Sequence, residues 1–199
     1  MSSRSCVYLI DDDELILDLH AELLSASGLK VRRFSSSRAF LSSYAATGDS
    51  ECILSDLRMP ELGGLELQAE LLARGVETPL IFITGHADVA TAVEAMRRGA
   101  FDYVEKPVDG RHLLARVQAA LARCAELRQA GQARREREQR LELLTAQERR
   151  IAEWVVQGKS SREISELASI SVRTVENHRA RIMDKLQVGS VVEMVRALL

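Results

Sequence analysis

The sequence predicts an α/β domain built on a parallel sheet, followed by a smaller all-helical domain. Short apolar runs alternate with helical patterns through the first 121 residues, whereas residues 144–199 show helical periodicity alone. Between them, residues 128–140 carry no large apolar side chain. A chain of 199 residues is long enough for two small domains that each bury a core.

Five short runs in the first part have the composition of strands, and helical patterns separate them. The expected strands are residues 6–10, 30–34, 52–55, 80–83 and 102–105. The expected helices are residues 14–27, 37–46, 65–74 and 87–98, with another starting near Gly110. Glycines expected at C-terminal caps follow three of them, at Gly28, Gly75 and Gly99. This alternation predicts a doubly wound parallel sheet covered by helices on both faces.

The segment after the fifth helix begins predicts a linker. Residues 128–140 (RQAGQARREREQR) can form neither a buried helix nor a coiled-coil seam. Their charge also suits a nucleic-acid arm, but Glu136 and Glu138 interleave with the arginines, which favours a solvated, largely helical spacer. We therefore expect domains at residues 1–121 and 144–199, joined by a linker at 122–143.

Four helices are expected in the last part, and cap residues mark where they start. Thr145 and Glu148 form a capping box before the first helix, and Ser160 or Ser161 caps the second. Ser171 caps a third helix over residues 172–186, and a fourth follows Ser190. The second helix, a turn at residues 168–170 and the third helix have helix-turn-helix proportions.

Composition places the chain among cytoplasmic proteins. No apolar run is long enough to span a bilayer, and the first ten residues do not form a signal peptide. Three cysteines without CxxC spacing argue against disulfides and structural zinc. Residues 1–121 carry 12 Lys/Arg and 18 Asp/Glu, whereas residues 122–199 carry 15 and 11. The basic second part is therefore expected to meet a polyanion, and the acidic first part a cation.

Polar residues follow the predicted strands where ligands bind in open α/β sheets. Aspartates 11 to 13 follow the first strand, and Asp56, Thr84 and Lys106 follow the third, fourth and fifth. Crowded carboxylates with hard oxygen donors favour Mg²⁺, and a metal-held Asp56 can attack a phosphorus centre. Thr84 and Lys106 can offset charge on the transferred oxygens. Asp13 is expected only to cap the following helix.

Four sequence blocks carry a family resemblance over about the first 120 residues. IDDDE at 10–14, LSDLRMPELGG at 54–64, FITGHAD at 82–88 and GAFDYVEKP at 99–107 resemble the receiver domain of bacterial response regulators. This resemblance implies a flavodoxin-like (βα)5 fold. It also implies that a sensor histidine kinase phosphorylates the chain in a Mg²⁺-dependent reaction, in which Mn²⁺ can substitute.

The resemblance assigns roles to individual residues. Asp56 becomes the phosphoryl acceptor, Asp12 a direct Mg²⁺ ligand, and Asp11 a ligand through water. The backbone carbonyl of Arg58 completes the protein ligands, and Thr84 and Lys106 hold the phosphoryl group. The remaining implied roles are an aromatic switch coupled to Thr84, at Tyr103, and a cis peptide bond before Pro107. Arg58 and His86 flank the expected pocket, where they either tune the lifetime of the aspartyl phosphate or are ordinary exposed loop residues.

The third helix of the last part has an apolar back and a polar front. A helical wheel places Val175, Ile182 and Leu186 on one face. Such a helix can enter a major groove, although any amphipathic surface helix has a polar face. The expected DNA contacts are Lys159, Arg173, Thr174, Glu176, Asn177, Ala180, Arg181 and Lys185.

A second resemblance covers nearly all of the last domain. LTAQERRIAEWVVQGKSSREISELASISVRTVENHRARIMDKLQV, at 144–188, resembles the LuxR-type helix-turn-helix. It implies that Glu176, Asn177 and Ala180 face bases, whereas the cations suit phosphates. Receiver, linker and helix-turn-helix in this order resemble the NarL/FixJ class of transcriptional regulators, nearer the FixJ side. The implied partners are double-stranded DNA, a second copy of the chain after phosphorylation, and RNA polymerase.

Two other function classes are weighed against this one. The receiver can be a pure binding module with constitutive DNA binding, although the complete set of Asp12, Thr84 and Lys106 argues against it. A metal-dependent phosphohydrolase is disfavoured because Arg58 stands where haloacid-dehalogenase phosphatases need Asp. The P-loop-like stretch at 158–160 lacks its first glycine, since residue 153 is Glu. We therefore expect a regulator and not an enzyme.

Overall fold

The computed structural model describes residues 5–85 and 88–199. The chain divides into two compact units, Met1–Arg128 and Gln129–Leu199. The division falls inside one helix, α5 (Gly110–Glu142), and inside the segment expected to be a linker. In the described part of the chain, no helix is both long and apolar enough to cross a bilayer.

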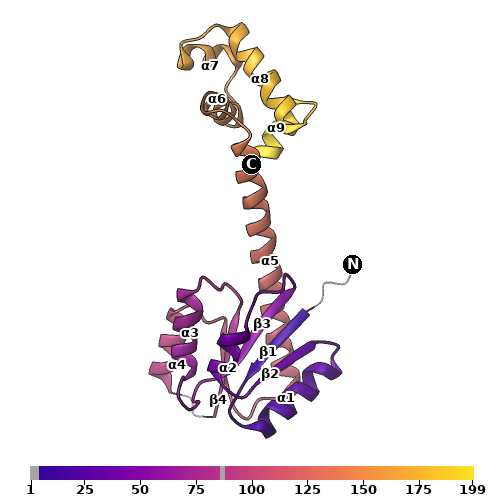
Figure 1. The fold of residues 1–199 in the computed structure, drawn as a ribbon, viewed down its shortest axis with the longest axis vertical. Coiled ribbons are helices and arrows are strands. Elements are labelled where there is room, and N and C mark those ends of the chain that lie inside the picture. Colours follow the sequence, from indigo (N-terminus) through magenta and orange to yellow (C-terminus); the bar gives the residue numbers. More distant parts are fainter. Residues whose placement is uncertain (1–4, 86–87) are drawn as a thin grey trace. The chain divides into compact units, whose positions relative to one another are not determined.

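The first unit is built on a parallel sheet (Figure 1). Its five strands within the described residues lie in the order β2-β1-β3-β4-β5. Their bounds are β1 Ser5–Ile10, β2 Lys30–Phe34, β3 Ser50–Asp56, β4 Leu80–Thr84 and β5 Asp102–Glu105. The predicted doubly wound fold is confirmed, and the order reverses direction beside β1, where such sheets bind ligands.

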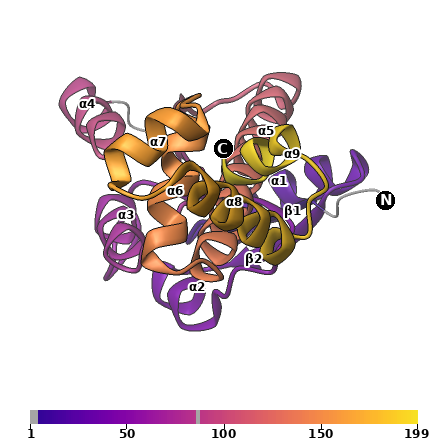
Figure 2. The same cartoon turned by 90° about the horizontal axis from the view of Figure 1, so that it is seen from above.

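Helices lie on both sides of this sheet (Figure 1 and Figure 2). Helices α1 (Glu14–Ala26) and α5 pack on one face, through Leu17, Leu24, Leu113 and Val117. Helices α2 (Ser37–Ser43), α3 (Gly64–Ala73) and α4 (Val89–Arg97) bury their apolar residues on the other face. Two cores therefore hold the strands between them, which fixes the positions of the strand ends.

Most helix ends lie where local chemistry predicts them. Gly28, Gly75 and Gly99 each follow a helix with positive φ, which a residue with a Cβ adopts only with strain. Helix α2 ends at Ser43, earlier than the expected Ala46, because Tyr44 takes an extended backbone and its hydroxyl bonds Glu51 and Thr78. The expected start of the fourth helix at Ala87 lies outside the described residues.

The second unit is helical around its own core, as predicted. Its helices are α6 Ala146–Val156, α7 Ser161–Ala168, α8 Val172–Leu186 and α9 Val191–Leu198. Thr145 and Glu148 form the predicted capping box. Ser160, not Ser161, caps α7, because its hydroxyl accepts from the Glu163 N–H. Residues from all four helices meet in one apolar cluster, including Ile151, Ile164, Ile182 and Met194.

Candidate functional site

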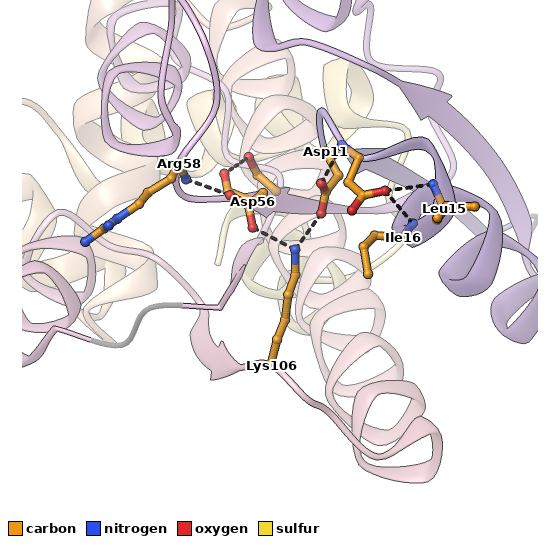
Figure 3. A network of polar contacts seen from close by, with 8 residues as sticks. Asp11, Leu15, Ile16, Asp56, Arg58 and Lys106 are labelled. Atoms are coloured by element: carbon orange, nitrogen blue, oxygen red, sulfur yellow. Dashed lines mark hydrogen bonds and ion pairs between the residues drawn. The ribbon is translucent and has the colours of Figure 1, made fainter.

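Two buried carboxylates and one ammonium meet at the carboxyl ends of three strands (Figure 3). Asp11 follows β1, Asp56 ends β3 and Lys106 follows β5. The Lys106 Nζ donates to Asp11 Oδ2 at 2.7 Å and to Asp56 Oδ1 at 2.8 Å. Asp11 and Asp56 are only 7% and 8% exposed, so their charges depend on this cation more than on water.

Electrostatics keep Lys106 charged. Burial works to lower the pKa of Lys106, but hydrogen bonds and attraction from Asp11 and Asp56 outweigh it and raise that pKa above its usual value. One ammonium offsets only one of two carboxylates, so the cluster retains a net negative charge. This arrangement attracts a further cation.

The backbone after β3 holds Asp56 in a defined orientation. Its Oδ2 accepts from the Arg58 N–H at 2.7 Å, and Ser55 Oγ donates to its backbone carbonyl at 2.8 Å. Gly64 lies against the same carbonyl, and a Cβ there would come within 2.8 Å of it. The Arg58 side chain extends away from the carboxylates (Figure 3). The loop therefore requires glycine at 64 and presents the Asp56 carboxylate toward Lys106.

The three aspartates after β1 have different positions. Asp13 caps α1 by accepting from the Leu15 and Ile16 N–H groups, as predicted. Asp11 Oδ1 accepts from the Asp13 N–H, which leaves its other oxygen for Lys106. Asp12 is exposed, whereas Asp11 beside it in the chain is buried. Among described residues, no three acidic, histidine or cysteine side chains come close enough to hold a metal ion together.

Thr84 and Tyr103 lie on neighbouring strands beside this cluster. Thr84 ends β4 with 1% exposure, and its carbonyl accepts from the Lys106 N–H at 2.8 Å. Tyr103 pairs with Phe82 one strand away, and burial raises the pKa of its hydroxyl. The Lys106–Pro107 peptide bond is cis, as the resemblance implied. His86, expected beside the pocket, lies outside the described residues.

The second unit contains a helix-turn-helix formed by α7 and α8. Ser169 ends α7 in the left-handed conformation, and Ser171 caps α8 through the Thr174 N–H. Val175 and Ile182 bury the back of α8. Most expected DNA contacts on α8 are exposed on its other faces, namely Arg173, Glu176, Asn177, Ala180 and Arg181. Thr174 and Lys159 are half-buried, and the Thr174 hydroxyl lies 2.8 Å from that of Ser171.

Two basic residues of α8 are engaged within the unit. Lys185, expected to contact DNA, donates to the buried Glu148 at 2.7 Å. Arg179, absent from the expected contacts, donates to Ser161 Oγ at 2.6 Å. A helical wheel carries the missing signal, because it places Arg179 about 40° from Val175, on the apolar side.

Known protein families match the two units separately. Residues 7–118 match the family "Response regulator receiver domain", and residues 142–198 match "Bacterial regulatory proteins, luxR family". The transcriptional regulatory protein FixJ of Azorhizobium caulinodans is 43% identical over 193 residues, covering 97% of this chain and 91% of its own. The tetrathionate response regulatory protein TtrR of Salmonella typhimurium is 40% identical over 190 residues, covering 96% and 90%.

Solved structures of response regulators have a similar fold. The response regulator StyR aligns with a TM-score of 0.84 and 32% identity, covering 98% of both chains. Full-length FixJ from B. japonicum aligns with a TM-score of 0.60 and 34% identity, covering 98% of this chain and 96% of its own. The likeness therefore extends over both units.

Proposed function

The chain belongs to the NarL/FixJ class of response regulators, and from this premise we propose that phosphorylation of Asp56 controls its binding to DNA. It is a two-component response regulator with a LuxR-type DNA-binding domain, that is, a transcriptional regulator and not an enzyme. We assign residues 1–121 to the receiver, 122–143 to the linker and 144–199 to the DNA-binding domain.

The bridge from Lys106 to Asp11 and Asp56 is the observation that carries the proposal. An oxygen of Asp56 attacks the phosphorus of a phosphohistidine on the partner kinase. The P–N bond breaks, and the histidine nitrogen keeps the electron pair. Lys106 exchanges its bond to Asp56 for a bond to a phosphoryl oxygen, and the Thr84 hydroxyl donates to a second phosphoryl oxygen.

The oxygen donors and net negative charge of the cluster fit Mg²⁺. Asp11, Asp12, Asp56 and the carbonyl of Arg58 would hold it, and Mn²⁺ has the same donor preference. When bound, the ion lowers the repulsion between Asp56 and the incoming phosphoryl oxygens. Because Asp12 is exposed, its side chain is free to turn toward the cluster.

Phosphorylation then shifts the receiver toward a state that dimerises. Thr84 moves toward the phosphoryl group, and Tyr103 turns inward. The proposed dimer surface is formed by α4, β5 and α5. It is supported by exposed apolar residues at helical spacing on α4, namely Val89, Val93 and Met96. Two copies then place two α8 helices on half-sites about one DNA turn apart.

The exposed face of α8 supports DNA reading. Arg173, Arg181, Lys159 and Thr174 are proposed to contact the backbone, which positions the domain without reading sequence. Glu176, Asn177 and Ala180 are proposed to face bases; Asn can bond adenine, whereas Ala180 offers only a methyl group. The partners are a sensor histidine kinase, double-stranded DNA, a second copy of the chain and RNA polymerase, in the cytoplasm.

Phosphoryl uptake from acetyl phosphate tests this function. Wild type and Asp56→Asn are incubated with and without Mg²⁺, and a phosphate-affinity gel separates the two forms. We expect Mg²⁺-dependent uptake by wild type alone, together with a gain in DNA affinity that Asp56→Asn lacks. No uptake by wild type would instead favour a constitutive binding module. An unchanged gain in Asp56→Asn would overturn control through Asp56.

A further inference from the structure

Two basic side chains of α8 bind partners within their own domain; Arg179 is half-buried, and the Lys185 side chain is 36% exposed. Arg179 Nη1 donates to Ser161 Oγ, the first residue of α7, at 2.6 Å. Lys185 Nζ donates to Glu148 Oε2, in the first turn of α6, at 2.7 Å. Each cation therefore joins α8 to a different neighbouring helix.

The contact of Arg179 crosses the helix-turn-helix itself. Arg179 and Ser161 are both half-buried, and 18 positions separate them in the chain. A guanidinium donates in fixed directions, so the bond restricts how far α8 can rotate against α7. The apolar contacts of Val175 and Ile182 lack this directionality.

The contact of Lys185 reaches a buried carboxylate. The Glu148 side chain is 5% exposed, and its Oε2 also accepts from the Thr145 N–H at 2.8 Å. Burial works to raise the pKa of Glu148, but hydrogen bonds from Lys185 and Thr145 outweigh it and lower that pKa to about 2. A charged Glu148 requires a cation, and Lys185 supplies it.

Arg179 and Lys185 lie on a different side of α8 from the residues proposed to contact bases. On a helical wheel, Arg179 lies about 40° and Lys185 about 80° from Val175, on opposite sides. Arg173 and Asn177 lie about 160° from Val175 on the same wheel. The two cations therefore flank the buried back of the helix, and the exposed polar residues face away from it.

We propose that Arg179 and Lys185 are positioning residues, which set the orientation of α8 against α7 and α6 and neutralise no DNA phosphate. The inference rests on the proposed DNA-binding function and replaces the expectation that Lys185 contacts DNA. Arg173 and Arg181 remain the phosphate contacts of the helix. Both are exposed, as Lys185 is, but within the described residues neither forms an ion pair.

Salt dependence separates the two roles. The logarithm of the DNA-binding constant falls linearly with the logarithm of the salt concentration. Each phosphate contact removed makes this slope shallower by about one, whereas a lost internal contact leaves the slope unchanged. The full chain, treated with acetyl phosphate and Mg²⁺, is titrated over a range of KCl with two duplexes. One duplex is selected by wild type from a random pool, and the other is unselected DNA of the same length.

Four single variants give matched comparisons. We expect Arg173→Met and Arg181→Met to weaken binding to both duplexes and to lower the salt slope by about one. We expect Arg179→Met and Lys185→Met to retain the slope and to lose about tenfold in preference for the selected duplex. A slope lowered by about one in Arg179→Met or Lys185→Met would overturn the proposal, as would an unchanged preference.

Partner substitutions distinguish positioning from a general loss of stability. Ser161→Ala should reproduce Arg179→Met, and the double variant should lose no more than either single one. Arg179→Lys should restore only part of the preference, because an ammonium can donate to the Ser161 hydroxyl but lacks the fixed directions of a guanidinium. If Lys185→Met fails to fold, Glu148→Gln/Lys185→Met removes both charges and serves instead. Additive losses in the Ser161 and Arg179 cycle would contradict the proposal. Failure of wild type to bind either duplex would overturn the DNA-binding function itself.

Discussion

The ammonium of Lys106 lies 2.8 Å from Oδ1 of Asp56, the carboxylate proposed to accept the phosphoryl group. The same ammonium also binds Asp11, so one cation holds two buried carboxylates of like charge together. In the proposed reaction, the phosphoryl group takes over one of these bonds. The resting geometry is therefore stabilised by the same residue that we propose to hold the phosphoryl group.

Lys106→Met should destabilise the receiver. Removing the cation leaves Asp11 and Asp56 facing each other, at a cost on the order of 1.5–3 kcal/mol. Urea unfolding at pH 7 measures the loss, with the exposed Lys30→Met as the matched control. Adding Asp56→Asn to Lys106→Met should recover most of the lost stability, because the repulsion between the carboxylates of Asp11 and Asp56 disappears. Equal stability of Lys106→Met and wild type would contradict the role of the bridge.

The second unit should lose stability in acid through Glu148. The pKa of this carboxyl is about 2 in the folded state, below its usual 4.5. The stabilisation is therefore complete above about pH 4.5 and is lost as the pH falls toward 2. Trp154 is the single tryptophan of the chain and packs against the core of this unit. Tryptophan fluorescence therefore reports on the unfolding of the second unit alone.

Thermal melts followed by Trp154 fluorescence check this dependence. Glu148→Gln should flatten the acid limb between pH 4.5 and 2, whereas the exposed Glu153→Gln in the same helix should leave it unchanged. The same acid limb in Glu148→Gln and wild type would assign the transition to other carboxyls.

Tyr8→Phe should destabilise the receiver at the opposite end of its sheet. The Tyr8 hydroxyl donates to Glu51 Oε1 at 2.9 Å, and the two residues are 0% and 1% exposed. Burial and the bond to Glu51 raise the pKa of Tyr8 above its usual value. Loss of this donor from a buried carboxylate should cost about 1–3 kcal/mol in urea unfolding. Tyr103→Phe, which leaves Glu51 untouched, should cost less.

Gly131→Ala should stabilise α5, although the same change elsewhere is harmful. Gly131 lies inside the helix, and an added Cβ would meet open space, so alanine should gain about 1 kcal/mol of local stability. Gly28→Ala should destabilise, because Gly28 has a φ of +81°. Hydrogen exchange at the amides of residues 129–136 measures the first change, and urea unfolding the second. Faster exchange in Gly131→Ala would contradict the prediction.

The sequence by itself determined the order and type of the elements. Alternating apolar runs predicted strands that lie within two residues of their observed ends, and cap chemistry placed the starts of α6 and α8. These features depend on neighbouring residues along the chain, which a sequence displays directly. The positions of Asp56 and Lys106 at strand ends follow for the same reason.

Only the tertiary structure decided which of these groups meet. The bridge from Lys106 to Asp11 joins residues 95 positions apart, and the bond from Lys185 to Glu148 joins residues 37 apart. Asp12 remains exposed beside a buried Asp11, although the two are adjacent in the chain. A basic residue on a helix suits a phosphate or a buried carboxylate equally well. Packing decides between them, because it determines which acceptor lies within reach of the side chain and how strongly water is excluded around it.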